Sequence, residues 1–169
     1  MNDLSLTILP ETPDDAPAID HLNARTFGPG RFAKTAYRIR EEVKHIPELS
    51  FTARVGTLLV GSVRLSPILI GQTQALLLGP LTVEPPFRDR GIGQALIGRA
   101  LEAAKGQGHR LVVLVGDEPY YGKVGFKPIA KGQVTMTGPV DPARLLIAEL
   151  SPGAFEGVTG AIRPDWDSR

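Results

Sequence analysis

The chain has 169 residues, of which 42% are hydrophobic and 22% charged, and its formal net charge is +1. This length and apolar content suit one domain over residues 1–169 and exclude a disordered chain. The small charge, without a basic stripe, argues against a nucleic-acid-binding protein, and the absence of cysteine excludes disulfides, thiolate metal sites and a cysteine nucleophile.

The first half of the sequence predicts a strand, two helices and a three-stranded meander. Alternating apolar residues predict the first strand, and apolar residues at helical spacing, such as Ile19 and Leu22, predict the helices. Two-residue turns at 56–57 and 71–72 fit antiparallel neighbours. The predicted elements are a strand at 4–9, a helix capped by Thr12 or Asp14 and broken after Phe27, a helix at 32–45, and strands at 49–55, 58–70 and 73–83.

The last of these strands contains Gly79-Pro80. Proline cannot donate a hydrogen bond to a sheet, so a regular central strand does not accommodate it. The dipeptide therefore predicts a bulge or a local splay near residue 79.

The second half alternates helices and strands. A helix over 94–105 places Leu96 and Ala100 on one apolar face and stops at Gly106, and the apolar run 111–115 is typical of a strand covered on both faces. Residues 151–169 give only a weak signal. The remaining predictions are a short helix at 120–124, extended chain at 125–128 and strands at 134–137 and 145–150. Together the elements predict a mixed α/β fold whose front half is largely antiparallel.

The segment Arg88–Gly93 joins the strand at 73–83 to the following helix and has the character of a phosphate-binding turn. Helix N-termini leave backbone N–H groups unpaired, and Gly91 and Gly93 carry no side chain that would keep a pyrophosphate from them. Packing alone also explains a Gly-x-Gly turn. The spacing does not fit a dinucleotide fingerprint, since Gly98 comes too late, and a P-loop lysine is absent.

Two stretches resemble the GNAT superfamily of N-acetyltransferases. The run 81–96 is similar to its acyl-CoA signature Arg/Gln-x-x-Gly-x-Gly/Ala, matched by Arg88, Gly91 and Gly93. The run 116–126 is similar to the family's Tyr-x-x-x-Gly-Phe signature, and its Gly-Asp-x-x-Tyr-Tyr form resembles a bacterial subgroup labelled YhbS-like. The resemblance implies a single GNAT-like domain, with a central, mostly antiparallel mixed sheet, two splayed parallel strands and helices on both faces.

The resemblance also implies how acetyl-CoA would bind as acyl donor. The pantetheine arm pairs with backbone groups of the splayed strand, and the pyrophosphate rests on the amides at the start of the helix. The expected cofactor-binding residues are Leu81, Thr82, Val83, Arg88, Asp89, Arg90, Gly91, Ile92, Gly93 and Gln94.

The implied chemistry is direct attack of an amine on the thioester, which needs no covalent enzyme intermediate. Tyr121 occupies the tyrosine position of the signature and is the expected general acid for the leaving thiolate, whereas Tyr120 is expected in the core. The strand at 73–83 carries no acid, so Glu84 and Asp117 are the candidates for the general base, and each has an alternative role in a turn or helix cap.

We therefore expect an N-acetyltransferase that acts on an amine of a small molecule or protein; the alternative is a non-catalytic acyl-CoA-binding sensor or partner module. Since dimers are common in the family, the resemblance also implies a homodimer as a candidate assembly. His21, His45 and His109 are too scattered for a metal cluster, and the 38–42 helix face, with charges of both signs, is expected to be solvated. Without a signal peptide or a long apolar run, we expect a cytoplasmic protein without a metal site or membrane contact.

Overall fold

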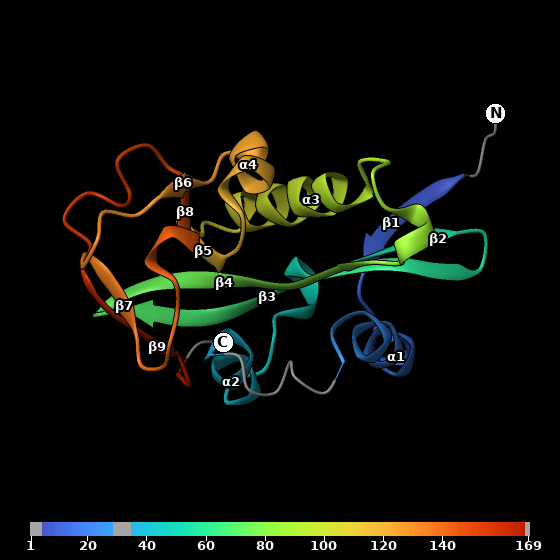
Figure 1. Cartoon of the computed structure of the whole chain (residues 1–169), viewed down its shortest axis with the longest axis horizontal. Coiled ribbons are helices and arrows are strands. Elements are labelled where there is room, and N and C mark those ends of the chain that lie inside the picture. Colours follow the sequence, from blue (N-terminus) through green and yellow to red (C-terminus); the bar gives the residue numbers. More distant parts are fainter. Residues whose placement is uncertain (1–4, 29–34, 168–169) are drawn as a thin grey trace.

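The protein folds around one mixed β-sheet with helices on both faces (Figure 1). The structure is a computed structural model, and it describes residues 5–28 and 35–167. The strands are β1 (Leu6–Pro10), β2 (Phe51–Val55), β3 (Leu58–Ile70), β4 (Thr73–Val83), β5 (Leu111–Val115), β6 (Lys127–Pro128), β7 (Val134–Met136), β8 (Leu145–Glu149) and β9 (Gly160–Pro164). The α-helices are α1 (Ala16–Phe27), α2 (Thr35–Glu41), α3 (Ile92–Gly106) and α4 (Glu118–Tyr121).

The sheet order is β1-β2-β3-β4-β5-β8-β6, with β9 pairing β3 and β7. Strands β1 to β4 form the antiparallel meander that the turns at 56–57 and 71–72 predict. The pair β4–β5 is parallel, as is β7–β9, and the other described pairs are antiparallel. The predicted fold class, a mostly antiparallel mixed sheet with a parallel pair and helices on both faces, is therefore confirmed.

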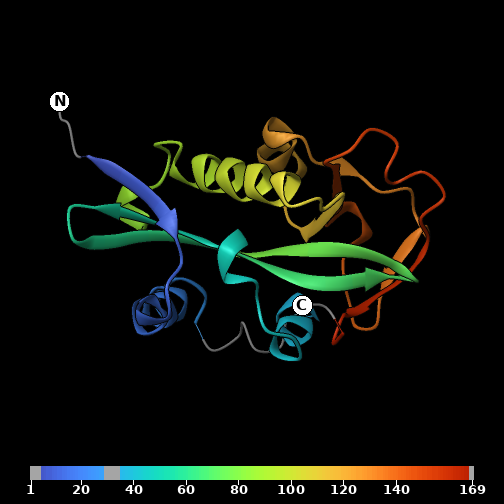
Figure 2. The same cartoon turned by 180° about the vertical axis from the view of Figure 1, so that it is seen from behind.

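The helices form two layers that enclose the sheet. Helices α3 and α4 lie on one face, and α1 and α2 lie on the other, as both views show (Figures 1 and 2). On the α3 face, fully buried Leu96 and Ile97 pack against the sheet residues Val63 and Leu76. On the opposite face Ile39 of α2 packs in a second cluster, so each face of the sheet has its own core.

Two helices have bounds that differ from the predictions. The predicted helix at 32–45 ends at Glu41, because the chain then turns so that the Ile46 amide donates to the Leu65 carbonyl at 2.8 Å. Its residues 32–34 lie outside the described residues, as does Leu4 of the first strand. The predicted helix at 120–124 begins two residues earlier, at Glu118, with Pro119 in its first turn, where proline is favoured.

Strand β9 lies in the segment that gave only a weak signal. It pairs with β3 at Ile68–Ile70, beyond the point where β2 stops, so β3 has neighbours along both edges. Close backbone contact makes this possible: a Cβ on Gly160 would lie 2.7 Å from the Gly71 Cα. The pairing depends on two glycines far apart in sequence, which no local pattern reveals.

Glu11, which follows β1, is the centre of a polar network between the sheet and the α1–α2 layer. Its carboxylate accepts hydrogen bonds from Arg64 Nε at 3.0 Å and Nη2 at 2.9 Å, and His45 Nε2 lies 2.9 Å from Glu11 Oε2. Burial raises the pKa of Glu11, but the hydrogen bonds and charges of His45 and Arg64 outweigh it, and the net pKa lies below the ordinary value. The buried carboxylate is therefore a stabilising partner when ionised.

Replacing Glu11 with glutamine should lower the free energy of unfolding by about 2 kcal/mol at neutral pH, because Arg64 loses a charged acceptor. Since the folded-state pKa is depressed, this contribution is present above the unfolded-state value, near 4.5, and is lost as pH falls through the folded-state pKa. Urea unfolding of wild type and Glu11→Gln between pH 3 and 8 measures it. A stability difference that does not change with pH would contradict the assignment.

Candidate active site

The parallel strands β4 and β5 separate shortly after they meet. They pair only at Leu76 with Val112 and at Leu77 with Val113, although both strands continue. Beyond that point β4 keeps its partner β3, and the register between them shifts where Gly79 and Pro80 lie. The bulge and splay predicted from Gly79-Pro80 are thus present, and among the described residues the β4 edge that faces β5 has no strand partner from residue 78 onward.

A cavity of about 560 Å³ occupies the gap. Three residues predicted for the site line it, namely Leu81, Asp117 and Tyr121. The other lining residues come from both strands, from the turn after β5, from α1, α2 and α4 and from the 139–144 segment: Asn23, Phe27, Ala36, Tyr37, Arg40, Leu78, Gly79, Pro80, Leu114, Val115, Gly116, Tyr120, Pro139, Val140, Asp141 and Arg144.

The start of α3 presents backbone donors next to this gap. Gly91 caps the helix in the left-handed conformation (φ 79°), and Asp89 also has positive φ (64°). The first bond that closes the helix runs from the Ala95 amide to the Gly91 carbonyl at 3.0 Å, so the amides of Ile92, Gly93 and Gln94 precede it and have no acceptor within the helix. This is the geometry of an anion-binding helix N-terminus.

The two arginines of this turn are exposed and lie against neighbouring groups. Arg88 Nε donates to the Val83 carbonyl at 3.1 Å, so this arginine braces the end of β4. Arg90 lies over the Phe87 ring, 5.7 Å from its centroid. Of the other predicted cofactor residues, Thr82 is buried and does not line the cavity, and its hydroxyl donates to Oδ1 of the lining residue Asn23 at 2.5 Å. The Thr82 side chain is therefore already engaged with Asn23.

Tyr121 is packed tightly into the wall of the cavity. A Cβ on Gly116 would lie 2.3 Å from Tyr121 Cε2, so the close approach requires glycine there. Edge-on contacts with the rings of Tyr120 (4.9 Å) and Phe126 (6.1 Å) hold it from two sides. Burial, with smaller contributions from Tyr120 and Asp117, raises the pKa of Tyr121 to about 12. The phenol is therefore protonated at neutral pH.

The expectation that Tyr120 belongs to the core is wrong. Tyr120 is 38% exposed, and it lines the cavity. A Cβ on Gly93 would lie 2.1 Å from the Tyr120 hydroxyl, so this hydroxyl rests on the first turn of α3. Tyr120 therefore lies between the cavity and the N-terminus of α3.

The two carboxylates predicted as bases have different surroundings. Glu84 forms an ion pair with Arg25 of α1 and does not line the cavity. Asp117 lines it, with a side chain that is 75% exposed and an Oδ1 that lies 3.3 Å from Arg144 Nε. Only Asp117 is thus positioned to reach a ligand in the gap.

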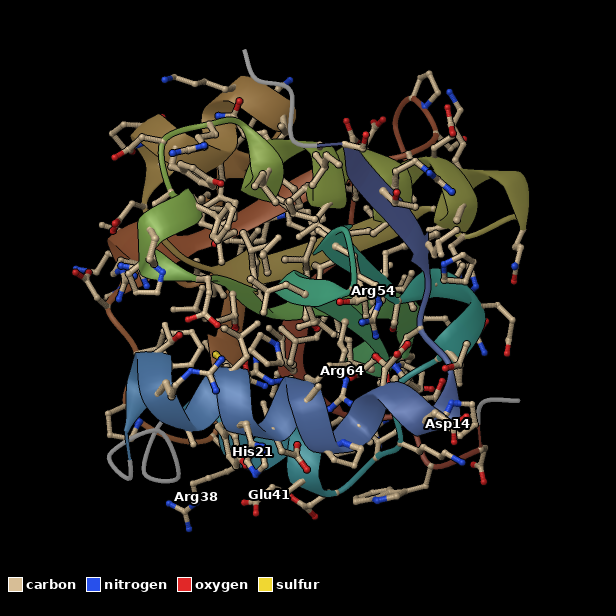
Figure 3. All side chains as sticks on the ribbon, turned by 90° about the vertical axis from the view of Figure 1, so that its right-hand side faces the viewer. Asp14, His21, Arg38, Glu41, Arg54 and Arg64 are labelled. Carbon is tan, nitrogen blue, oxygen red and sulfur yellow. The ribbon has the colours of Figure 1, made fainter. Side chains whose placement is uncertain are left out.

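Arg40 differs from the prediction for its helix. The 38–42 face was expected to be solvated, and Arg38 and Glu41 do point away from the sheet (Figure 3). Arg40 instead turns inward and lines the cavity, and burial lowers its pKa to about 10. The spacing gave a signal, because Arg40 follows Tyr37 by three residues and shares its helix face.

No helix in the described ranges 5–28 and 35–167 is long and apolar enough to cross a membrane. In the same part of the chain, no three His, Asp or Glu side chains gather closely enough to hold a metal ion.

Comparisons with known proteins agree with this geometry. A family model described as an acetyltransferase (GNAT) domain matches residues 47–128. The chain is 29% identical over 154 residues to the uncharacterized N-acetyltransferase YhbS of Escherichia coli K12, covering 90% of this chain and 92% of YhbS. It is 30% identical over 120 residues to a second E. coli N-acetyltransferase, YjhQ, covering 69% of this chain and 66% of YjhQ.

Solved structures give the same result. The crystal structure of E. coli YhbS in complex with CoA superposes with a TM-score of 0.82 at 26% identity, over 98% of this chain and 92% of that one. A GNAT family acetyltransferase from Brucella melitensis in complex with acetyl-CoA gives a TM-score of 0.70 at 25% identity, over 96% and 97% of the two chains.

Substituting Gly116 with alanine should destabilise the fold by about 1–3 kcal/mol, because the added methyl group overlaps the Tyr121 ring. Gly122 is the matched control, since it has helical φ (−58°) and open space around its Cα, so Gly122→Ala should be neutral or slightly stabilising. Denaturant midpoints of the two variants compare them directly. Equal midpoints would show that Gly116 does not fix the ring.

Proposed function

This chain contains a GNAT acetyltransferase domain, and on that premise we propose that it transfers an acetyl group from acetyl-CoA to an amine by direct attack. The observation that carries the proposal is the unpaired edge of β4 beyond Leu77, which faces the cavity and lies beside the α3 N-terminus. An extended pantetheine arm has the reach and the amide groups to add to such an edge as a strand does.

In this proposal, the CoA lies along Leu81, Thr82 and Val83 and places its pyrophosphate at the turn before α3. The donors are the backbone amides from Arg88 to Gln94, with Gly91 and Gly93 allowing close approach. Charge-assisted hydrogen bonds contribute roughly 1.5–3 kcal/mol each, so a few of them suffice for micromolar affinity. Arg90 adds positive charge at the surface, where its contribution is small because solvent screens it.

The acetyl group then lies near the bulge at Gly79-Pro80. The amine nitrogen attacks the thioester carbonyl carbon, a tetrahedral oxyanion forms, and the C–S bond breaks as the carbonyl re-forms. Tyr121 donates its proton to the leaving thiolate, and the amine gives up its own proton to a base. We assign Asp117 as that base, since Glu84 is paired with Arg25 away from the cavity.

Saturating CoA should raise the melting temperature by roughly 5–10 °C at a hundred times its Kd, whereas NAD and ATP should leave it unchanged. Gly91→Ala should weaken CoA binding about tenfold, because alanine is strained at the positive φ of residue 91. This conformation sets the orientation of the backbone amides at the start of α3. Gly98→Ala, on an exposed part of the same helix, is the control and should bind CoA normally. Stabilisation by NAD or ATP but not by CoA would overturn the assignment.

Tyr121→Phe should lower turnover by about tenfold or more with little change in CoA affinity, because the proton for the thiolate is lost while the ring packing stays. Thiol release from acetyl-CoA with a panel of amines measures turnover, and Tyr120→Phe is the matched comparison. Unchanged turnover in Tyr121→Phe would remove its role. Thiol release that no amine stimulates, with CoA still bound, would favour a non-catalytic acyl-CoA-binding module instead.

A further inference from the structure

A second, smaller pocket lies across the bulge from the cleft. Its volume is about 290 Å³, and it is bounded by α1, α2, β3 and the segment after α2. Five residues line both this pocket and the cleft, which places the two on either side of one boundary: Asn23, Tyr37, Arg40, Gly79 and Pro80. An amine in the small pocket would therefore face the position proposed for the acetyl group.

Arg40 at this boundary is a largely buried cation without an anionic partner among the described residues. Its Nε is buried and has no hydrogen-bond partner, and within the described residues no carboxylate lies within 4.0 Å of its guanidinium. Its described contact is with the Tyr37 ring, 5.8 Å from the centroid. A pKa of about 10, lowered by burial, still leaves the group charged at neutral pH. An unpaired buried charge destabilises the folded protein. A ligand that carries a negative charge would compensate this cost, which gives a reason for an arginine at this position.

Other arginines of the same layer do have partners. Arg64 is bound by Glu11, and Arg54 donates to Asp15 Oδ1 at 2.6 Å. Both lie between the helices and the sheet (Figure 3). Of these three arginines only Arg40 lines both cavities, and it is the one that has no carboxylate of the described residues within 4.0 Å.

The bulge is shaped to receive this guanidinium. A Cβ on Gly79 would lie 2.8 Å from Arg40 Nη1, so any larger residue at 79 would press on it. Gly79 also has a positive φ of 139°, which disfavours other residues. The guanidinium is thus held directly beside the backbone at which the thioester is proposed to lie.

The remaining charges of the small pocket do not neutralise Arg40. Asp20, Glu41 and Lys44 are solvent-exposed, where water and salt screen them. His45 and Arg64 are already engaged with Glu11. Among the described residues that line the pocket, Arg40 Nε is therefore the buried side-chain donor that lacks a hydrogen-bond partner. The guanidinium that carries it has the planar geometry that matches a carboxylate.

We propose that the acceptor is a small amine that carries a carboxylate close to its amino group, as an α-amino acid does, and that Arg40 binds this carboxylate. The inference rests on the proposed transfer reaction, and it names the acceptor class. The pocket volume fits a small molecule, and the position of Arg40 beside Gly79 leaves the amino group within reach of the thioester carbonyl.

Product binding tests the proposal without requiring turnover. Calorimetry in the presence of CoA compares a panel of N-acetyl-α-amino acids with the matching primary amides, in which the carboxylate is neutral. In wild type, at least one acid should bind ten times or more tightly than its amide. Arg40→Gln should abolish that preference, and Arg38→Gln, an exposed arginine on the same helix, should preserve it. Equal or absent binding of acids and amides, or a preference that survives in Arg40→Gln, overturns the proposal.

A stability measurement tells whether Arg40 binds a ligand or stabilises the fold. If its role is to bind a ligand, Arg40→Met should melt at the same temperature as wild type or higher, because the substitution removes an unpaired buried charge. A clear fall in melting temperature would make Arg40 structural and overturn the proposal. Thiol release with the parent amines is run in parallel. Release with neutral amines and no preference for acids overturns only the acceptor class, whereas selective binding of acids without any release overturns only the transfer reaction.

Discussion

The separation of β4 from β5 after Leu77 is the constraint on which the rest of the site depends. Two parallel strands that stayed paired would close the sheet and leave no edge for a ligand. Because Gly79 and Pro80 shift the register with β3, the strands part while the sheet beneath remains continuous. The gap then receives Tyr120 and Tyr121 from one side and Arg40 from the other. One irregularity in one strand therefore creates both the cleft between β4 and β5 and its boundary with the smaller pocket.

Two charged residues in the layer between the sheet and α1–α2, Glu11 and Arg40, have opposite surroundings. Glu11 is surrounded by partners, and its depressed pKa reflects interactions that favour the ionised form in the folded protein. Arg40 is largely buried and has no anionic partner among the described residues, and its pKa is lowered as well. A lowered pKa of a cation means that the folded protein disfavours its charged form. The first arrangement stabilises the wall of the pocket. The second leaves a charged donor unpaired beside the position proposed for the acetyl group, and such perturbed groups are typical of binding sites.

Sequence patterns predicted the elements whose stability is local and failed where distant partners decide. The meander, α3 and β5 follow from turns, helical spacing and a buried apolar run, and the Gly79-Pro80 irregularity follows from the missing donor of proline. The end of α2 is set instead by the bond from Ile46 to Leu65 on β3. Strand β9 exists because Gly160 approaches Gly71. Tyr121 could be placed by its motif, whereas the inward turn of Arg40 and the exposure of Tyr120 depend on packing that the sequence does not display.

The late position of β9 in the sequence has a consequence for the order of folding. Arg163 of β9 donates to the Gly71 carbonyl across 92 residues of chain, and Trp166, just after it, donates to the Glu42 carbonyl at the end of α2. Closing so long a loop is slow compared with forming a hairpin. During synthesis the meander and α3 emerge well before β9, so α2 lacks this anchor at first. The wall that α2 contributes to both the cleft and the smaller pocket is therefore anchored last, after the meander and α3 have emerged.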